Sequence, residues 1–332
     1  MRRQTRREFL GHAAGSAATA GAGLTLLKSP SLWAVGGDIP RRELGKTGER
    51  VSLLCLGGYH IGVPKSPAEG MRIIEAAIDR GISFLDNSDD YHQGESEVRM
   101  GKAIRGKRQQ VFLMTKHHGR DKKTALRTLE ESLRRLQTDY LDLWQFHEIV
   151  YETDPDWVFS PHGGIEAAYL AKKQGKVRYI GFTGHKDPAI HLKMLSKPYE
   201  WDTVQMPLNL LDPHYHSFEK HVLPMLVERK IGVIAMKPLA GGNLLKTNTV
   251  APIEALHYVM SLPVSAVCTG CESMEILAQA IRAVVSFQPL SKPEMSSLRV
   301  RTQPFGMTGR YEPFKSTSSY DAPRVAPPPY AP

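Results

Sequence analysis

Short apolar runs alternate with longer amphipathic stretches from about residue 50 onward. The short runs are rich in Val, Ile, Leu and Phe, as expected for buried strands, and the longer stretches repeat apolar residues at helical spacing. In one of them Leu126, Leu129, Leu133 and Leu136 share a helix face. The predicted strands are 51–56, 82–85, 111–115, 140–146, 177–182, 203–206, 232–236 and 265–269. The predicted helices are 67–80, 95–104, 122–136, 163–174, 188–195, 217–229, 252–260 and 274–285.

This regular alternation of strand and helix predicts a parallel sheet. Eight units at a pitch of about 30 residues fit a closed (β/α)8 TIM barrel, which needs ~250 residues, better than an open sheet. The barrel is expected to occupy 35–290, opening with a hairpin that turns at Lys46-Thr47-Gly48. Ser66 and Glu69 predict a capping box for the first helix. After Pro293 an irregular, Pro-rich extension over 291–332 is expected.

The first 34 residues form a separate segment. A basic beginning contains Arg6-Arg7-Glu8-Phe9-Leu10 and is followed by a weakly hydrophobic Ala/Gly-rich stretch. This order resembles a twin-arginine export signal, with a disordered basic tail as the alternative. The resemblance implies the twin-arginine export machinery as a partner, export of the already folded chain, and a periplasmic location in a bacterium.

Charge and hydropathy reduce the number of possible functions. The formal charge is +9 over 332 residues, and part of it lies in the arginines of the first segment. The remaining positive charge is spread along the chain, without the basic stripe and interleaved aromatics of a nucleic-acid binder, so no nucleic acid is expected.

The longest uncharged run, 9–27, is too rich in Gly, Ala, Ser and Thr for a membrane span. Three cysteines do not make a disulfide framework, and Cys268-Thr-Gly-Cys271 is better explained as a buried strand residue followed by a loop residue.

Titratable side chains follow three consecutive predicted strands. Asp86 ends the second and is followed by Tyr91, Lys116 ends the third, and His147 ends the fourth. Because function in such a barrel sits at the carboxyl ends of the strands, these residues are expected to converge. An ammonium lowers the pKa of a neighbouring tyrosine, a carboxylate orients the lysine, and a histidine can hydrogen-bond a carbonyl. Together they predict an acid that protonates an alkoxide as hydride reaches the carbonyl carbon.

Four segments make a resemblance to the aldo-keto reductase family specific. They are 84–97 around Asp86 and Tyr91, 114–116 with Lys116, 139–147 with His147, and the opening 42–48. The resemblance covers about residues 40–290 and implies that Asp86, Tyr91, Lys116 and His147 are a catalytic tetrad. Each residue also has an ordinary structural explanation, as a helix cap, a packed ring, a solvated strand-end charge or a core histidine.

The resemblance further implies a nicotinamide cofactor, NADP(H) or alternatively NAD(H). The family's Ser-Asn pair for the carboxamide is replaced by Thr183-Gly184, leaving His185 or Gln205 to compensate. Glycine-rich loops fit close approach to phosphate, and Glu272 stands where relatives often carry a cation, which predicts weak discrimination for the 2′-phosphate. The implied cofactor residues are Gly57, Thr183, Gly184, His185, Gln205, Lys237, Pro238, Leu239, Gly241, Gly242, Gly270, Glu272 and Ser273.

No metal is expected, because the many histidines show no regular ligand spacing, and the Cys-free tail predicts no iron–sulfur cluster. The leading hypothesis is an oxidoreductase acting on a small carbonyl or sugar-like substrate, with Tyr59, Trp157, Tyr215 and the tail as candidate pocket residues. A nucleotide-binding regulatory or interaction protein on the same barrel is the alternative. An unrelated barrel lyase or hydrolase fits the loops less well.

Overall fold

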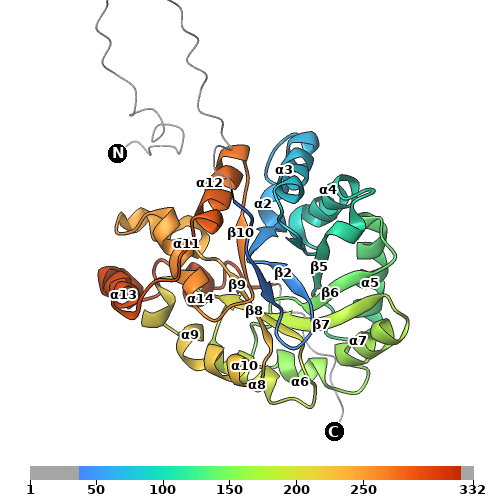
Figure 1. The fold of residues 1–332 in the computed structure, drawn as a ribbon. Helices are drawn as coiled ribbons and strands as arrows, with labels where there is room; N and C mark the ends of the chain where they lie inside the picture. The colour runs from blue at the N-terminus through green and yellow to red at the C-terminus, as the bar shows by residue number, and fades with distance from the viewer. Residues whose placement is uncertain (1–36, 323–332) are drawn as a thin grey trace, which may run out of the picture. The chain divides into compact units, whose positions relative to one another are not determined.

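Eight parallel strands close into a barrel in the computed structural model, which describes residues 37–322 (Figure 1). The predictions for the export segment therefore lie outside the described residues. The strands pair in the order β10-β3-β4-β5-β6-β7-β8-β9, so each βα unit places its strand beside the previous one. The barrel strands are β3 (Leu54–Gly57), β4 (Phe84–Asp86), β5 (Phe112–His117), β6 (Leu141–Phe146), β7 (Val177–Thr183), β8 (Thr203–Pro207), β9 (Gly232–Met236) and β10 (Ala266–Gly270).

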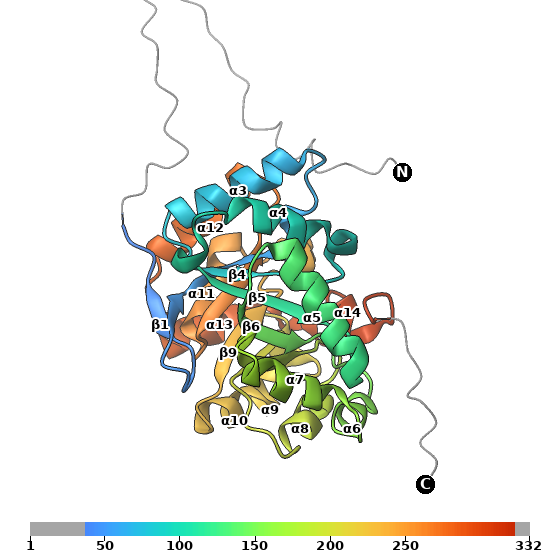
Figure 2. The same cartoon turned by 90° about the vertical axis from the view of Figure 1, so that its right-hand side faces the viewer.

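Helices surround the barrel, and the view turned by 90° shows α3, α4 and α5 side by side along its outside (Figure 2). The helices are α2 (Gly58–Ile61), α3 (Pro67–Asp79), α4 (Glu95–Ala103), α5 (Lys122–Leu136), α6 (Asp154–Val158), α7 (Gly164–Lys173), α8 (Pro188–Leu195), α9 (Phe218–His221), α10 (Leu223–Glu228), α11 (Pro252–Ser261), α12 (Met274–Val285), α13 (Lys292–Gly306) and α14 (Pro313–Ser316). The predicted (β/α)8 barrel is confirmed. Among residues 37–322, no helix is both long and apolar enough to cross a membrane.

The predicted N-terminal hairpin is present as β1 (Arg41–Glu43) paired antiparallel with β2 (Arg50–Ser52). Its turn carries Leu44, which is fully buried in the apolar cluster that fills the barrel together with Phe84, Phe112 and Leu143. A Cβ on Gly45 would collide with the backbone of Gly232. The hairpin therefore packs tightly against the amino end of β9 and leaves the carboxyl ends of the strands for function.

Two predicted elements are each divided in the structure. The strand expected over 51–56 is split into β2 and β3, because the chain bends at Leu53, and the hydroxyl of Ser52 donates across the bend to the Leu54 carbonyl at 2.7 Å. The helix expected over 217–229 is split into α9 and α10. Pro224 stands in the first turn of α10, where its missing N–H cannot continue the ladder of α9.

Two predictions about helix ends and the tail are wrong. Ser66 precedes α3 as expected, but its side chain makes no capping hydrogen bond. The extension is not irregular throughout, because α13 and α14 lie within it. A capping box does form at Ser291. Its hydroxyl accepts from the Glu294 backbone N–H, and its backbone N–H donates to the Glu294 carboxylate.

Candidate active site

The ends of three neighbouring strands bring the predicted tetrad together. Asp86 is the last residue of β4, Lys116 lies near the end of β5, and His147 directly follows β6. The parallel register pairs Asp86 with Met114 and Lys116 with Gln145, so these ends are level at one rim of the barrel. Tyr91 opens the 3-10 helix η1 (Tyr91–Gly94) on the loop after β4.

Lys116 is the centre of the site, with only 1% of its side chain exposed. Its Nζ lies 2.5 Å from Asp86 Oδ1, donates to the Asn87 carbonyl at 2.6 Å and donates to Tyr91 Oη at 3.0 Å. The ammonium therefore forms one ion pair, with Asp86, and two hydrogen bonds, with the Asn87 carbonyl and the Tyr91 hydroxyl. Asn87 was not predicted, because its contribution is a backbone oxygen that no sequence pattern marks.

The tyrosine is held in its protonated form. Burial raises the pKa of Tyr91 above its usual range and outweighs the lowering effect of the Lys116 ammonium. The net direction is thus opposite to the lowering expected from the lysine alone. Burial lowers the pKa of Lys116, but the Asp86 carboxylate and Tyr91 outweigh it, so its pKa also stands above the usual range. A protonated hydroxyl beside a permanent ammonium is suited to giving up a proton during a reaction.

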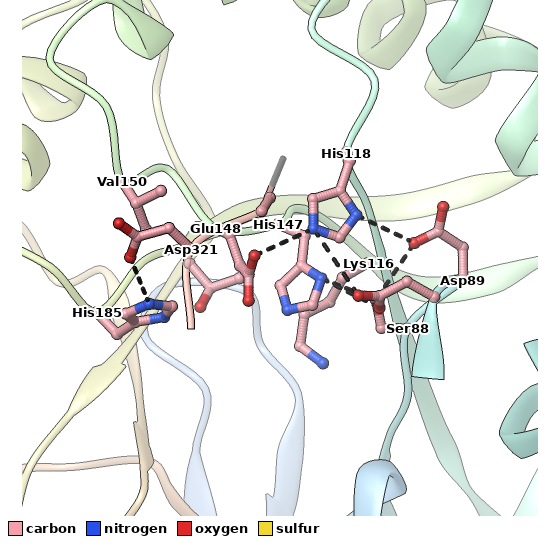
Figure 3. A network of polar contacts seen from close by, with 12 residues as sticks. Ser88, Asp89, Lys116, His118, His147, Glu148, Val150, His185 and Asp321 are labelled. Carbon is pink, nitrogen blue, oxygen red and sulfur yellow. Dashed lines mark hydrogen bonds and ion pairs between the residues drawn. The ribbon is translucent and has the colours of Figure 1, made fainter. Parts of the chain in front are cut away.

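His147 faces the tyrosine as a neutral ring. The two rings are T-shaped with centroids 5.6 Å apart. Nδ1 of His147 lies 2.9 Å from Ser88 Oγ (Figure 3). Burial, followed by the nearby charges of His118 and Lys116, holds the pKa of His147 well below its usual range. The ring therefore acts as a hydrogen-bonding group. Ser88 was not predicted, although its place two residues after Asp86 on the same loop could have identified it.

Side chains inside the barrel contact the Asp86 carboxylate. Cys268 Sγ donates to Asp86 Oδ2 at 3.1 Å, and Gln205 Nε2 approaches the same oxygen at 3.5 Å. Gln145 Nε2 in turn donates to Gln205 Oε1 at 2.9 Å. Cys268 lies in β10 and Cys271 follows it, both buried with free thiols, which confirms the strand-and-loop interpretation of this pair. The contact of Cys268 with Asp86 was not predicted.

The candidate cofactor residues follow consecutive strand ends around the same rim. Thr183 ends β7 opposite Gln205 on β8, Lys237 follows β9, and Gly270 ends β10 opposite Gly57. Because β7, β8, β9, β10 and β3 are neighbours, these positions form a continuous track beside the tetrad. Such a track fits an extended dinucleotide.

The loop after β9 has the open backbone that phosphate binding requires. Pro238 and Leu239 lead into the 3-10 turn η4 (Ala240–Gly242). Gly241 and Gly242 have φ of +66° and +85°, and a Cβ on Gly241 would meet nothing within 4 Å. Glycine adopts this conformation without strain, and it leaves the backbone accessible to a phosphate group.

The residues that could replace the family's carboxamide-binding amide differ in where the structure places them. A Cβ on Gly184 would collide with the Ile149 carbonyl, so no amide side chain fits at this position. His185 is buried and its Nε2 lies 3.7 Å from Asp321 Oδ1, on the side of the C-terminal segment (Figure 3). Gln205, beside Asp86, is therefore the better placed of the two candidates to compensate for the lost amide.

The last candidate loop leads into α12. Ser273 is the N-cap of this helix, and its hydroxyl accepts from the Ile276 N–H at 3.3 Å. Glu272 directly precedes the cap. The amino end of a helix attracts phosphate, whereas a carboxylate repels it, so this loop carries opposing contributions.

The three aromatic residues proposed to line the pocket differ in exposure and in their distance from the tetrad. Tyr59 is 51% exposed and its ring is T-shaped against Tyr91, with centroids 5.6 Å apart. Trp157 is only 7% exposed within α6. Tyr215 packs its ring against His216, after η3 (Asp212–His214). Tyr59 is therefore the aromatic residue that the structure sets beside the tetrad.

The fold and this arrangement define an oxidoreductase of the aldo-keto reductase class. The sequence model of the Aldo/keto reductase family matches residues 53–258, so the chain belongs to that family. It is 28% identical over 310 residues to the uncharacterized oxidoreductase YqkF of Bacillus subtilis (strain 168), covering 79% of this chain and 96% of that protein.

Solved structures show the same barrel. The holo form of aldo-keto reductase AKR11C1 from Bacillus halodurans matches with a TM-score of 0.68 and 25% identity, covering 79% of this chain and 96% of that chain. An aldo/keto reductase from Klebsiella pneumoniae in complex with NADP and acetate matches with a TM-score of 0.66 and 24% identity, covering 79% and 95%.

Proposed function

We propose that this chain reduces a small carbonyl compound, with Tyr91 as the proton donor and NADP(H), or alternatively NAD(H), as the hydride carrier. The observation that carries the proposal is the contact of Lys116 Nζ with both Asp86 Oδ1 at 2.5 Å and Tyr91 Oη at 3.0 Å. The contact gives a protonated phenol a fixed positive neighbour, which stabilises the phenolate left after proton transfer.

The chain's own residues account for the proton side of the reaction. The neutral ring of His147 hydrogen-bonds the substrate oxygen, and the Tyr91 hydroxyl gives its proton to that oxygen. Lys116, held by Asp86, stabilises the resulting tyrosinate. When bound along the rim from Thr183 to Gly270, a nicotinamide supplies the hydride that adds to the carbonyl carbon.

The rim residues favour neither nucleotide strongly. The Klebsiella pneumoniae relative was solved in complex with NADP, whereas Glu272 here places a carboxylate before the N-cap of α12. A carboxylate ~4 Å from a phosphate charge costs on the order of 1–4 kcal/mol in a partly exposed site. We therefore expect Glu272→Arg to raise the affinity for NADP relative to NAD, measured by fluorescence titration. An unchanged ratio of the two affinities would contradict this role.

Location suggests the substrate class. The segment with Arg6 and Arg7 resembles an export signal for folded proteins. An exported reductase meets the sugars and other small carbonyls outside the cytoplasmic membrane, so a sugar-like carbonyl is the proposed substrate. Loading of the nucleotide before export, and tight retention afterwards, would keep the nucleotide on such an enzyme, and each further turnover would require oxidation of an alcohol to reduce it again.

Replacement of Tyr91 by Phe tests the proposal. Loss of the acid is expected to lower carbonyl reduction by ~10²–10⁴-fold while nucleotide binding stays near the wild-type value. Tyr169→Phe, on the exposed side of α7, is the matched control and should keep full activity. Wild-type turnover by Tyr91→Phe would refute the acid role. Tight nucleotide binding without turnover of any carbonyl by the wild type would favour the alternative, a regulatory protein on the same barrel.

A further inference from the structure

A second group of polar side chains lies beside the tetrad at the carboxyl ends of the same three strands. Asp89 and Asp90 follow β4, His118 follows β5 and His147 follows β6. One ligand atom from each lies within 4.8 Å of the others. Figure 3 shows the ring of His118 above that of His147, with Asp89 on one side and Glu148 on the other. Of this group, only His147 takes part in the proposed proton transfer from Tyr91.

The separations are close to those within a metal coordination shell. His147 Nδ1 lies 3.6 Å from Asp90 Oδ1, and His118 Nε2 lies 4.0 Å from Asp90 Oδ2. The other ring nitrogen of His118, Nδ1, lies 3.6 Å from Asp89 Oδ1, so an ion bound at Nε2 would have Asp89 as an outer partner that orients the ring. Ligands bound at ~2.1 Å in a tetrahedron stand about 3.4 Å from one another. Small side-chain rotations would therefore bring two nitrogens and one or two carboxylate oxygens to a common centre.

The surroundings add negative charge and partial shielding. Glu148 Oε2 lies 3.4 Å from His118 Nε2, which brings a third carboxylate to the group. The side chains of Asp89 and Glu148 are 18% exposed and that of His147 is 6% exposed, whereas Asp90 is 46% exposed. The group is thus closed on the protein side and open at Asp90, which provides an entry path.

We propose that Asp90, His118 and His147, assisted by Asp89, bind a divalent transition-metal ion at the mouth of the active site. Imidazole nitrogens combined with carboxylate oxygens suit Zn²⁺, Co²⁺ and Mn²⁺ better than Ca²⁺ or Mg²⁺, which prefer oxygen alone. The sequence predicted no metal because the residues come from three different loops, and no regular spacing along the chain joins them.

Ser88 is the group that must move. Its hydroxyl lies 2.9 Å from His147 Nδ1 and 3.3 Å from Asp89 Oδ1, so it stands where the ion would approach. A hydroxyl rotates about one bond, and it can turn away without any change of backbone. Ser88→Ala removes this competitor and is therefore expected to leave metal affinity equal or tighter.

The ion would also act on the reaction, a consequence that rests on the proposed function. A metal bound to Nδ1 of His147 requires the hydrogen of the neutral ring to be on Nε2, on the opposite side. His147 then becomes a fixed hydrogen-bond donor toward the substrate oxygen. The ion itself is a positioning group in this arrangement, since the imidazole ring stands between it and the reacting atoms.

Direct binding measurements on the full chain test the site without nucleotide or carbonyl. After treatment with a chelator and its removal, the protein is titrated with Mn²⁺, followed by the loss of the free-ion electron paramagnetic resonance signal, and with Zn²⁺ by calorimetry. One saturable site per chain is expected. Asp90→Asn and His118→Gln should each weaken binding at least about tenfold. His216→Gln is the matched control, because His216 also faces a carboxylate, with Nδ1 2.8 Å from Asp187 Oδ2, but lies on the surface.

Absence of a saturable site, or equal affinity in Asp90→Asn, His118→Gln and His216→Gln, would overturn the proposal. If His118→Gln does not fold by circular dichroism, Ser88→Ala decides, since weaker metal binding in that variant contradicts the geometry. These measurements contain no substrate, so their failure leaves the proposed reductase activity untouched. A chain that binds the metal but reduces no carbonyl would keep the site and refute the activity.

Discussion

The buried ammonium of Lys116 makes the site depend on a single carboxylate. Its other two partners, the Asn87 carbonyl and the Tyr91 hydroxyl, are uncharged when the tyrosine is protonated. Breaking a buried ion pair by removing one member leaves an uncompensated charge, which is far more costly than loss of an exposed pair. The geometry of the proposed tetrad and the stability of the barrel are therefore linked through Asp86.

Asp86→Asn is expected to lower the free energy of unfolding by about 3–5 kcal/mol and to abolish reduction, because the ammonium stays buried without its counter-charge. The double variant Asp86→Asn/Lys116→Met removes both charges and should recover part of the stability but no activity. Urea denaturation measures the stability of both variants, and a carbonyl-reduction assay measures their activity. Glu200→Gln, which removes the exposed partner of Lys46, is the control and should change stability by less than ~1 kcal/mol. Equal effects of Asp86→Asn and Glu200→Gln would contradict the dependence on Asp86.

The convergence of Asp86, Tyr91, Lys116 and His147 was predictable at this scale, because each residue ends or follows a strand that the apolar pattern marks. The supporting contacts were not predictable in the same way. Cys268 reaches Asp86 across a separation of 182 residues, a contact that requires the closed barrel and both side-chain orientations. The net direction of the pKa of Tyr91 likewise depends on burial, which only the packed site defines.

At the scale of elements, the C-terminal segment is anchored by buried charges. Lys315 Nζ lies 2.7 Å from Asp212 Oδ1 and 3.0 Å from Glu312 Oε2, and all three side chains are at most 1% exposed. Asn209 donates to Glu312 Oε1 at 2.8 Å. The Pro-rich composition of the tail predicted an irregular chain. Neither this composition nor the spacing of its apolar residues reveals that Lys315 is buried against the loop after β8.

This anchor predicts a pH dependence of stability. Burial raises the pKa of Glu312 to about 7, above the ~4.3 of an unfolded glutamate. A raised folded-state pKa contributes stability that is present below the unfolded pKa and is lost as the pH rises through the folded one. Between about pH 5 and about pH 8 the wild type should therefore lose roughly 1–3 kcal/mol more unfolding free energy than Glu312→Gln. Urea denaturation across this range measures it, and parallel curves for the two proteins would show that Glu312 does not titrate there.

At the scale of the whole molecule, the order of units around the barrel follows from the sequence, since eight strand–helix repeats in succession have one right-handed closed arrangement. The closing register, Cys268 beside Cys55, could not be predicted, because it is set by packing of the two strands that lie furthest apart in the chain. The proposed export signal in residues 1–34 belongs to this scale too, since a route for folded proteins would carry the barrel as a unit.

Changing Arg6 and Arg7 together to Lys is expected to leave the full-length chain in the cytoplasm, because paired arginines are the feature that the twin-arginine route requires. Fractionation with size analysis of each fraction measures this. Lys28→Arg, which keeps the charge of the same segment, is the control and should not change export. Processed protein outside the cytoplasmic membrane in the double-arginine variant would contradict the proposed route.

Hydride transfer to a carbonyl is tested most directly by following the hydrogen itself. The purified chain is supplied with reduced nicotinamide nucleotide carrying deuterium at the transferable C4 position and with a set of small aldehydes, ketones and keto sugars. The expected result is an alcohol that carries one deuterium on the former carbonyl carbon, formed by the wild type and, ~10²–10⁴-fold more slowly, by Tyr91→Phe. An alcohol free of deuterium, or bound nucleotide that remains unoxidised with every carbonyl, would contradict the proposed function.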